Sequence, residues 1–526
     1  MKTLLAAFLG ISVIVGIGVT RLRDHLNRRE RMVPVAFDIQ TGMNIRWSAQ
    51  SGSTSFSSPV FHRGKVFIGT NNTTGYLPRY PSIVDLGVLL CFDASDGSLL
   101  WQASSEKLST GRVHDWPLQG IVSTPAVQDD RLWYLTNRCE LACLDTQGFY
   151  DQEDDGVPLS ADVALSIKEA DVVWKLDLMK ELDVNPHNAS ASSPVVADGR
   201  VFVVTGNGLS SDHVTNASVD APSFIAVDAA TGALIWSDDS PSPNILHGQW
   251  GSPTYGVFQG VPQVIFPGGD GWLYSFDPAG NPDGTGKLLW KFDCNPKDSV
   301  WLLGGRGTRN NLLARPTVHD GLVYVTVGQD PEHGDGVGHV WCIDPNKSGD
   351  VSTELVFHSA SPQQPIAHKR VQACDAKAGD FTQPNRNSAM VWHYTGMDLD
   401  GDGEIADSES MHRTLSQVAI EGELAFFTDT YGLIHCVDRR TGRGHWQYDL
   451  LASTWSTPVI SADHVIVTDE DGAVSAFALS ADPTIAMPGG NPLSISHLDS
   501  SGYATPTINN GVLYILSSKK LYAISD

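Results

Sequence analysis

The strongest signal for chemistry in this 526-residue chain is the stretch MDLDGDGEIADSE at residues 397–409. Acidic residues recur there at alternate positions, Gly403 follows the third of them, and a distal glutamate closes the span. This is the ligand spacing of an EF-hand calcium loop, in which the seventh position offers its main-chain carbonyl and the twelfth a bidentate carboxylate. The spacing therefore predicts a calcium site at 398–409 with the ligands Asp398, Asp400, Asp402, Glu404 and Glu409.

The segments on either side of this loop do not have helical patterns. VWHYTG before it and TLSQVAIEG after it alternate as β-strands do. The loop is thus expected to connect two strands, and we interpret it as a structural calcium clip rather than a switch. The alternative is an acidic surface turn that binds no ion.

An internal repeat indicates the architecture that positions this loop. Eight segments begin with small residues, mostly followed by proline, and continue as a hairpin: 57–69, 123–136, 192–206, 251–266, 314–328, 415–429, 456–469 and 504–517. Most are followed by a third strand that ends in Asp, a Thr-Gly or Asp-Gly turn, and a fourth strand that carries Trp. The repeat predicts an all-β fold, an eight-bladed β-propeller of four-stranded antiparallel blades.

The two ends of the chain complete the predicted ring. The last repeat stops at KLYAISD (520–526) without a fourth strand, and FDIQTGMNIRWSAQ (37–50) supplies an unassigned one. Pairing of the two termini in one blade is expected to close the ring and remove its open edges.

The repeat resembles the PQQ-like repeat of quinoprotein alcohol dehydrogenases and of the outer-membrane β-barrel assembly factor B. The matching features are the Asp-x-x-Thr-Gly turns and the tryptophans Trp101, Trp236, Trp290 and Trp446, with departures in blades two and seven. Stretches such as GRVHDWPLQGI (111–121) and FPGGDGWLYSFD (266–277) are similar to secreted PQQ-repeat proteins of planctomycete-type bacteria. The resemblance covers residues 37–526 and implies a propeller fold and export, without a specific activity.

The N-terminus predicts a membrane anchor. Residues 4–19 form a continuous apolar run with no small-residue cleavage site after it, and five arginines follow at positions 21–31. We expect residues 1–32 to be a signal-anchor and basic juxtamembrane stretch and residues 33–526 to be the propeller. The arginines alone favour a cytoplasmic propeller. The resemblance instead implies the periplasmic or surface side of the envelope, or secretion after cleavage, and that is our expectation.

The net charge and the cysteine positions argue against two classes of function, nucleic-acid binding and thiol chemistry. The formal net charge is −25, which argues against nucleic-acid partners. Cys91, Cys143, Cys342 and Cys436 share one repeat position, two residues before Asp, where other repeats carry Ala or Ser. This position is therefore interpreted as a tight packing site and not as a thiol centre.

Long connections after second and fourth strands are expected to share one face of the ring, and rigid scaffolds commonly recognise partners through such loops. Two insertions, 145–171 and 346–389, follow third strands and are expected on the other face. The candidate binding face comprises Arg112, His114, Asp115, Trp116, His247, Trp250, Arg306, Arg309, Asp330, Glu332, His333 and His339. No recognised hydrolase signature occurs among these residues, so no catalytic residue is assigned.

The sequence therefore favours a membrane-tethered envelope scaffold that binds a protein or glycan and carries a structural calcium ion. The alternative is a dehydrogenase that uses pyrroloquinoline quinone (PQQ) with calcium, as the resemblance permits. In such dehydrogenases a vicinal Cys-Cys pair usually lies against the quinone, and this chain has no Cys-Cys and no C-x-x-C-H haem motif.

Overall fold

The computed structural model describes residues 30–154, 156, 166–300, 308–330, 332, 334 and 336–526. The predicted signal-anchor at the N-terminus lies outside the described residues, except for its last three positions. Within the described ranges, no helix combines the length and apolarity needed to cross a bilayer. The described chain begins in contact with the ring. The Arg31 guanidinium donates to the Glu421 carboxylate, and the Arg31 carbonyl accepts from the Ser461 hydroxyl.

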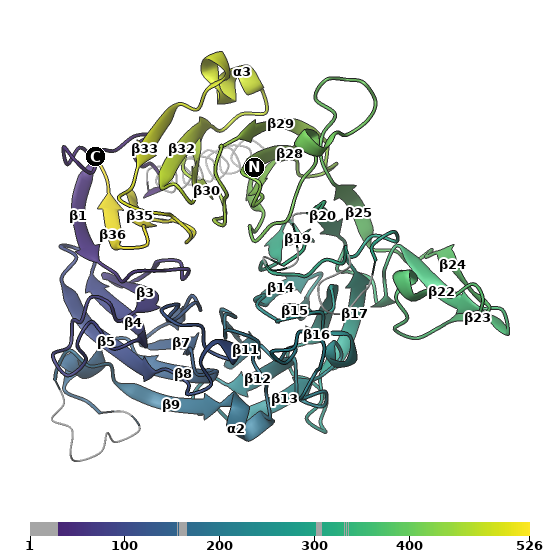
Figure 1. Ribbon diagram of the computed structural model, residues 1–526, viewed down its shortest axis with the longest axis horizontal. Helices are drawn as coiled ribbons and strands as arrows, with labels where there is room; N and C mark the ends of the chain where they lie inside the picture. Colours follow the sequence, from purple (N-terminus) through teal and green to yellow (C-terminus); the bar gives the residue numbers. More distant parts are fainter. Residues whose placement is uncertain are drawn as a thin grey trace, which may run out of the picture.

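The fold is all-β, as predicted, and consists mainly of antiparallel four-stranded sheets that follow one another around a ring (Figure 1). We call each sheet of the ring a blade, and in blades 1–7 the strands pair in chain order. Blade 1 contains β2 (Val60–His62), β3 (Lys65–Asn71), β4 (Leu86–Asp93) and β5 (Leu99–Glu106). Blade 2 contains β6 (Ala126–Gln128), β7 (Arg131–Leu135), β8 (Glu140–Asp145) and β9 (Val172–Asp177).

Blade 3 contains β10 (Val195–Ala197), β11 (Arg200–Val204), β12 (Phe224–Asp228) and β13 (Leu234–Asp238). Blade 4 contains β14 (Thr254–Phe258), β15 (Val261–Pro267), β16 (Trp272–Asp277) and β17 (Lys287–Asp293). Blade 5 contains β18 (Thr317–His319), β19 (Leu322–Val327), β20 (His339–Ile343) and β25 (Met390–Tyr394).

Blade 6 contains β26 (Ala419–Glu421), β27 (Leu424–Thr428), β28 (Leu433–Asp438) and β29 (Gly444–Asp449). Blade 7 contains β30 (Val459–Ile460), β31 (His464–Thr468), β32 (Ala473–Ala478) and β33 (Ser494–His497). Blade 8 combines both ends of the chain: β34 (Thr507–Asn509), β35 (Val512–Leu516), β36 (Lys520–Ile524) and β1 (Ile45–Gln50).

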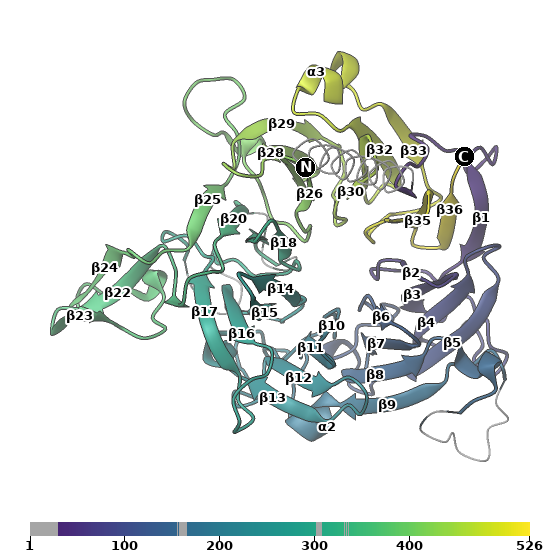
Figure 2. The same cartoon turned by 180° about the vertical axis from the view of Figure 1, so that it is seen from behind.

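The predicted pairing of the two termini is present. β1 runs antiparallel to β36, with Trp47 opposite Ala523 and Ala49 opposite Leu521. Figures 1 and 2 show the two strands side by side, where the purple and yellow ends of the chain meet. The last strand therefore has a partner on both sides, β35 and β1.

The register explains the shared cysteine position. In blade 1, Cys91 of β4 lies opposite Trp101 of β5, and the pairing shifts by one residue immediately afterwards. The same cross-strand pair is Cys143 with Trp174 in blade 2, Cys342 with Trp392 in blade 5, and Cys436 with Trp446 in blade 6. A small side chain is required opposite the indole, which confirms the interpretation as a packing site. All the described cysteines are free thiols.

The sequence predicts departures from the tryptophan pattern in blades 2 and 7, and the structure corrects this for blade 2. Trp174 of β9 fills the position, but the insertion at 145–171 separates it from its repeat. Blade 7 does depart, since Ser494 stands opposite Ala476 there.

These outer tryptophans also join neighbouring blades. The Nε1–H of Trp101 donates to the Thr146 carbonyl of blade 2, and that of Trp174 donates to the Ala229 carbonyl of blade 3. The indole packs on the glycine of the same turn: a Cβ added to Gly232, whose φ is +73°, would lie 2.6 Å from Trp174 Cε3. The Thr-Gly turn is thus the docking site for the preceding blade, and hydrophobic clusters fill the space between blades.

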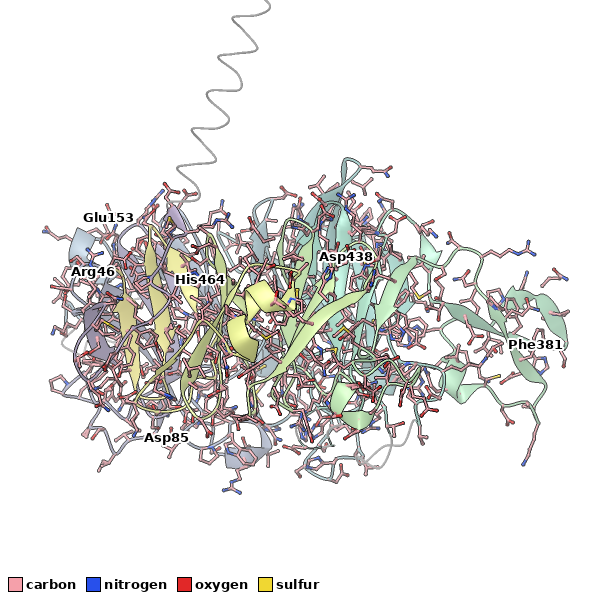
Figure 3. All side chains as sticks on the ribbon, turned by 90° about the horizontal axis from the view of Figure 1, so that it is seen from above. Arg46, Asp85, Glu153, Phe381, Asp438 and His464 are labelled. Carbon is pink, nitrogen blue, oxygen red and sulfur yellow. The ribbon has the colours of Figure 1, made fainter. Side chains whose placement is uncertain are left out.

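One insertion forms a separate sheet. Residues after β20 add β21 (Gly349–Asp350) as a parallel fifth strand to blade 4, and then form β22 (Glu354–His358), β23 (Ser361–Pro365) and β24 (Asp380–Pro384). This three-stranded sheet projects from the outside of the ring, as the labels β22–β24 in Figure 1 and Phe381 in Figure 3 show.

Helices are few and short in the described residues. They are α2 (Leu178–Leu182), α3 (Pro483–Ala486) and the single 3-10 turns η1 (Gly111–Val113), η2 (Gly148–Asp151), η3 (Ser242–Asn244), η4 (Val371–Ala373), η5 (Asp407–Glu409) and η6 (Pro488–Gly490). Connections after second and third strands emerge on opposite faces: in Figure 3, Asp85, which precedes β4, lies on the other side of the ring from Glu153, which follows β8.

Candidate functional site

A cavity of about 710 Å³ lies on the axis of the ring. Every blade contributes two residues to its lining. In blade 1 they are Ser58, which immediately precedes Pro59, and Phe56, two positions before Ser58, and the other blades contribute the residues at the same repeat positions. Because alternate residues of extended chain point to the same side, these two positions form two layers around the axis. The short first strands are therefore the innermost, and their leading residues line the cavity.

The first layer is mostly hydroxyl-bearing and is held by hydrogen bonds between blades. The Ser58 backbone N–H donates to Thr124 Oγ1, and the Thr124 N–H donates to Ser193 Oγ, both at 2.9 Å. The Gln417 and Thr457 N–H groups make the same 2.9 Å bonds to Thr457 Oγ1 and Thr505 Oγ1. These hydroxyls stabilise the ring itself, so this layer is a rigid floor.

Blade 5 departs from this layer with Arg315. Its Nη2 donates to the Ser193 carbonyl at 2.9 Å and to the Pro194 carbonyl at 3.3 Å. Burial lowers the pKa of Arg315 to about 10. Arg315 is the one cationic side chain among the described residues that line the cavity.

The second layer is an apolar collar of unequal side chains. Phe56, Trp455 and Tyr503 come from blades 1, 7 and 8 and contact one another, with ring centroids 5.1–5.8 Å apart. Trp250 of blade 4 belongs to the same layer, whereas blades 2 and 3 contribute only Val122 and Ala191. The collar therefore carries aromatic side chains on one part of its circumference and small side chains on another.

A loop from between blades 1 and 2 covers the small part of the collar. Trp116 and Leu118 of this loop line the cavity, and both remain exposed to solvent. The Arg112 guanidinium lies 4.8 Å from the Trp116 ring centroid, and the Trp116 N–H donates to the Asn188 carbonyl. These contacts hold an aromatic side chain at the mouth of the cavity.

The residues of the predicted binding face have different roles in the structure. Trp116, Trp250 and Glu332 line the axial cavity. His247, Asp330 and Glu332 belong to a polar cluster beside it. His114 bonds Asn185 through Nε2 at 2.9 Å and supports the loop that carries Trp116.

Three other predicted residues are buried supports. Asp115 accepts from Lys107, from the Leu108 N–H and from Asn137. Arg309 donates to the Leu246 carbonyl at 2.7 Å, and His339 pairs with His393 at 3.0 Å. For Asp115 and Arg309 the physical reason is that a long, polar connection must satisfy its backbone groups, and these charged side chains bond such groups here. His339 is instead the first residue of β20. Arg306 and His333 lie outside the described residues.

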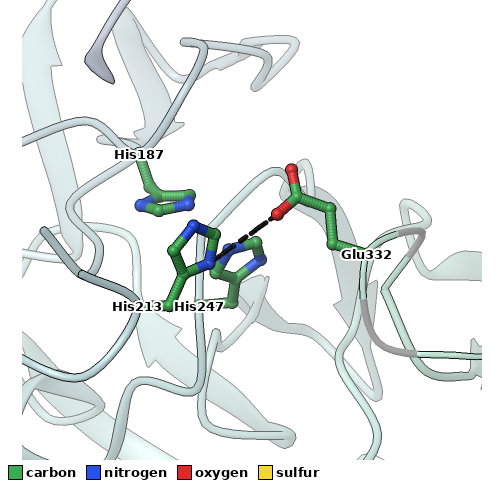
Figure 4. Close-up of side chains that lie close together, drawn as sticks. All are labelled: His187, His213, His247 and Glu332. Carbon is green, nitrogen blue, oxygen red and sulfur yellow. Dashed lines mark hydrogen bonds and ion pairs between the residues drawn. The ribbon is translucent and has the colours of Figure 1, made fainter. Parts of the chain in front are cut away.

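The polar cluster contains two histidines that sequence reasoning did not single out. His187 follows β9, His213 follows β11, His247 follows β13 and Glu332 follows β19, so all four come from connections after second or fourth strands. Figure 4 shows the three imidazoles converging, with the Glu332 carboxylate directed at them. One ligand atom from each side chain lies within 4.8 Å of the others.

The distances within the cluster are short. His247 Nε2 lies 2.8 Å from His213 Nδ1 and 3.5 Å from Glu332 Oε2. Glu332 Oε2 lies 3.7 Å from His213 Nδ1. The ring centroids of His187 and His247 are 4.0 Å apart. The sequence places His187 (in NPHNAS) and His213 (in SSDHVT) in connections of the loop-rich face. Nothing in either segment predicts that the two histidines meet.

The predicted calcium loop has a compact geometry. Oxygens of Asp398, Asp400 and Glu409 lie within 4.8 Å of one another, and Glu409 is buried. The Glu409 carboxylate accepts from the Leu399 and Ala406 N–H groups at 2.7 and 2.9 Å, and these bonds hold its pKa below the ordinary value. Asp402 and Glu404 are exposed, and the Asp402 carboxylate accepts from the Glu404 N–H.

The loop lies between two strands, as predicted, and its two ends are hydrogen-bonded to each other. The Met397 N–H donates to the Glu409 carbonyl, and the Met411 N–H donates to the Thr395 carbonyl. The loop connects β25 of blade 5 with β26 of blade 6, and Gln447 of β29 donates to the Ser408 carbonyl. Its position therefore allows an ion to link two blades.

Comparison with known proteins gives one family match. The profile described as "Outer membrane protein assembly factor BamB" matches residues 161–281 and 385–482. A polyvinylalcohol dehydrogenase of Sphingopyxis sp. (strain 113P3) is 23% identical over 384 residues, a match that covers 56% of this chain and 56% of that protein. The chain thus spans about half the length of this curated relative.

A solved structure of BamB has a similar fold. BamB from Moraxella catarrhalis superposes with a TM-score of 0.50 at 14% identity, covering 91% of this chain and 98% of that one. The quinohemoprotein alcohol dehydrogenase ADHIIG from Pseudomonas putida HK5 gives a TM-score of 0.49 at 11% identity, covering 94% and 78%. The profile match and the curated relative confirm that the chain resembles PQQ-like repeat proteins in sequence, and the BamB structure shows the shared fold.

Proposed function

We propose that this chain is an eight-bladed propeller of the cell envelope that binds an extended polymer, a polypeptide segment or a glycan, in its axial cavity. The observation that carries the proposal is the collar of Phe56, Trp250, Trp455 and Tyr503 above a floor of small hydroxyl residues. Aromatic faces bind apolar side chains and sugar rings without requiring a particular charge. The match to the outer-membrane assembly-factor profile supports the envelope and a protein partner.

A binding role fits the way in which the polar groups are used. The floor hydroxyls bond the backbones of neighbouring blades, and Arg315 bonds two carbonyls. These groups are therefore occupied in stabilising the ring, and the collar is left as the contacting surface. The cavity also opens toward the face that carries the long connections, where a chain can enter between Trp116 and Trp250.

The calcium loop is part of this proposal as a structural element. The oxygens of Asp398, Asp400 and Glu409 face one another on a loop that joins blades 5 and 6. Hard oxygen ligands at this spacing suit calcium. Bound calcium neutralises three carboxylates and holds the two blades together, without reaching the axial cavity.

The test uses the full-length chain in calcium on arrays of outer-membrane-protein peptides and of bacterial envelope glycans. Any hit is then titrated by tryptophan fluorescence. Trp455→Ala removes one wall of the collar, and at least about a tenfold loss of affinity is expected, as for a buried aromatic anchor. Tyr431→Ala, at an exposed aromatic residue outside the cavity, is the matched control.

A result in which Trp455→Ala and wild type bind equally contradicts the cavity assignment. Binding on one array only decides between a polypeptide and a glycan. The absence of binding on both arrays, with a folded protein, counts against the proposed function itself.

A quinoprotein dehydrogenase is the second candidate, because the curated relative is a polyvinylalcohol dehydrogenase. The described lining residues do not fit PQQ with calcium. PQQ is a polycarboxylate, and the cavity offers it one guanidinium, that of Arg315, which already bonds two carbonyls. Glu332 is the one acidic lining residue among those described, too few for a calcium site of oxygen ligands.

Titration of the full-length protein with PQQ in excess calcium, followed by tryptophan quenching, tests this alternative. The collar tryptophans lie on the cavity, so a bound quinone must quench them. We expect no saturable quenching in the micromolar range. Saturable quenching that Trp250→Ala removes would instead establish the quinone site, and alcohol oxidation would be measured next.

A further inference from the structure

The cluster of His187, His213, His247 and Glu332 has more lone pairs than protons. His187 Nδ1 lies 2.6 Å from the Leu209 carbonyl, which can only accept, so this nitrogen carries the ring proton. The neutral ring then has an unprotonated Nε2, and this atom is buried with no hydrogen-bond partner among the described residues. His187 as a whole is 1% exposed.

His247 has the same arrangement. Its Nδ1 faces the Asp330 carboxylate, with Oδ1 at 3.4 Å, so the ring proton is favoured there. Its Nε2 is then a second lone pair, 2.8 Å from His213 Nδ1 and 3.5 Å from Glu332 Oε2. Two imidazole lone pairs and a carboxylate oxygen thus lie around one space, and among the four described members of the cluster His213 is the one that can bring a proton to it.

The surrounding groups orient these atoms as second-shell partners orient metal ligands. A metal-binding histidine usually donates its other ring N–H to a carbonyl or carboxylate. The Leu209 carbonyl fills this role for His187, and the Asp330 carboxylate lies 3.4 Å from His247 Nδ1. The Glu332 Oε1 accepts from Asn188 Nδ2 at 3.0 Å, which leaves Oε2 directed at the histidines.

The backbone brings the histidines together at some cost. A Cβ added to Gly208 would lie 2.7 Å from the His247 carbonyl and 2.8 Å from His187 Cβ, so only glycine permits this approach. His213 has a φ of 57°, an uncommon conformation for a residue with a side chain. The Trp250 Nε1–H donates to the His187 carbonyl and its indole packs edge-on against His247.

From this geometry we propose that His187 Nε2, His213 Nδ1, His247 Nε2 and Glu332 Oε2 bind a divalent transition-metal ion, with zinc as the favoured ion. A cation at the centre neutralises the carboxylate and takes up the lone pairs that now face one another. The site is chemically distinct from the loop at 398–409, which offers carboxylate oxygens alone.

The ligand set decides which metal is favoured. Imidazole nitrogens prefer zinc, copper, nickel or iron to calcium and magnesium, which take oxygen ligands. Three nitrogens with one carboxylate oxygen form the donor set of a four-coordinate zinc ion. Copper binds such sites more tightly in general, and competition between the two ions is part of the test.

The site borders the axial cavity, since Asn188, Trp250 and Glu332 also line it. A bound ion would join the loops that follow β9, β11, β13 and β19, and so would fix one side of the mouth. The proposal does not depend on which polymer, if any, occupies the cavity.

The test is cobalt and zinc binding by the full-length chain, freed of metal with a chelator and assayed in excess calcium so that the loop at 398–409 is not a competitor. Cobalt is the probe because its visible absorption reports nitrogen ligation and a low coordination number. We expect one tight cobalt ion per chain with intense visible bands, its displacement by zinc, and a higher melting temperature in zinc than in chelator.

Two variants at the exposed side of the cluster avoid disturbing the buried rings. His213→Asn suits the left-handed backbone there, and Glu332→Gln keeps the bond to Asn188. Each removes one ligand and is expected to weaken metal binding by at least about tenfold. His497→Gln, at an exposed histidine elsewhere, and Glu409→Gln, in the calcium loop, are expected to bind cobalt as the wild type does.

Absence of saturable cobalt and zinc binding would overturn the proposal. So would tight binding that His213→Asn and Glu332→Gln leave unchanged, because the ion would then lie elsewhere. Displacement of zinc by copper with the same dependence on both variants would support the site and change the assigned metal.

Discussion

The Trp236 indole of blade 3 donates its Nε1–H to the Pro278 carbonyl of blade 4, at 3.0 Å. The ring is fully buried, and a Cβ added to Gly280 would lie 2.4 Å from its Cδ1. One side chain thus unites two repeats, filling the space between their sheets and bonding the turn of the second. The same relationship recurs between Trp392 and the Arg439 carbonyl, and between Trp446 and the Ser480 carbonyl.

Trp236→Ala is therefore expected to lower the free energy of unfolding by about 3–5 kcal/mol, as for other buried aromatic truncations. Trp236→Phe keeps most of the packing, loses the hydrogen bond, and should cost less. Urea unfolding measures both. Trp116→Ala, at a tryptophan that is 39% exposed, should change stability little. Equal midpoints for Trp236→Ala and wild type would mean that the indole does not hold the blades together.

Glu409→Gln is expected to lower the melting temperature in calcium and to leave it nearly unchanged in chelator. The amide retains an acceptor oxygen for the Leu399 or Ala406 N–H but loses the charge that a calcium ion requires. Thermal denaturation in the two buffers measures the difference.

The matched control for this prediction is Glu404→Ala. Position seven of such a loop uses its main-chain carbonyl, and the Glu404 side chain is exposed. The variant should therefore keep the calcium-dependent stability. An equal loss for Glu409→Gln in calcium and in chelator would rule out the clip.

The buried carboxyl of Asp293 is expected to make the free energy of unfolding depend on pH. Burial, together with the charges of Asp270 and Asp350, raises the pKa of Asp293 from 3.8 to about 8, and its Oδ2 has no hydrogen-bond partner among the described groups. The folded state therefore holds a proton that the unfolded chain releases. The resulting stability is fully present below pH 3.8 and is lost progressively as the pH rises through 8.

In Asp293→Asn the side chain is an amide that stays neutral at every pH, so this variant does not lose stability as the pH rises. The variant should gain on the wild type in melting temperature between pH 5 and pH 8.5, and thermal scans across that range measure the gain. Asp96→Asn is the control, because the Asp96 carboxylate accepts from the Ser98 N–H, which lowers its pKa. A constant difference between Asp293→Asn and wild type at all pH values would contradict the prediction.

Removal of residues 520–526 is expected to destabilise the whole ring. It deletes β36, which pairs with β35 and β1 and contributes Leu521, Ala523 and Ile524 to two core clusters. The edges of β1 and β35 become unpaired. Circular dichroism and urea unfolding should show a broad, early transition, whereas removal of Asp526 alone should have little effect. A truncated chain that unfolds like the wild type would show that closure does not support the other blades.

The sequence by itself determined the repeat, the antiparallel strands and the joining of the two ends, because all three follow from patterns that recur along the chain. Alternation, turn residues and the tryptophan position are local, and a missing strand at one end matched an extra one at the other. The calcium-type loop was equally visible, since its ligands lie within one short segment.

What only the tertiary structure decided is how separate repeats combine. The collar residues Phe56, Trp250 and Tyr503 occupy one repeat position, but that this position faces a shared axis depends on the ring. His187, His213, His247 and Glu332 are separated by up to 145 residues and lie in connections without a common motif. Their convergence depends on loop packing, on the close approach at Gly208 and on hydrogen bonds such as that of Trp250, which no local pattern encodes.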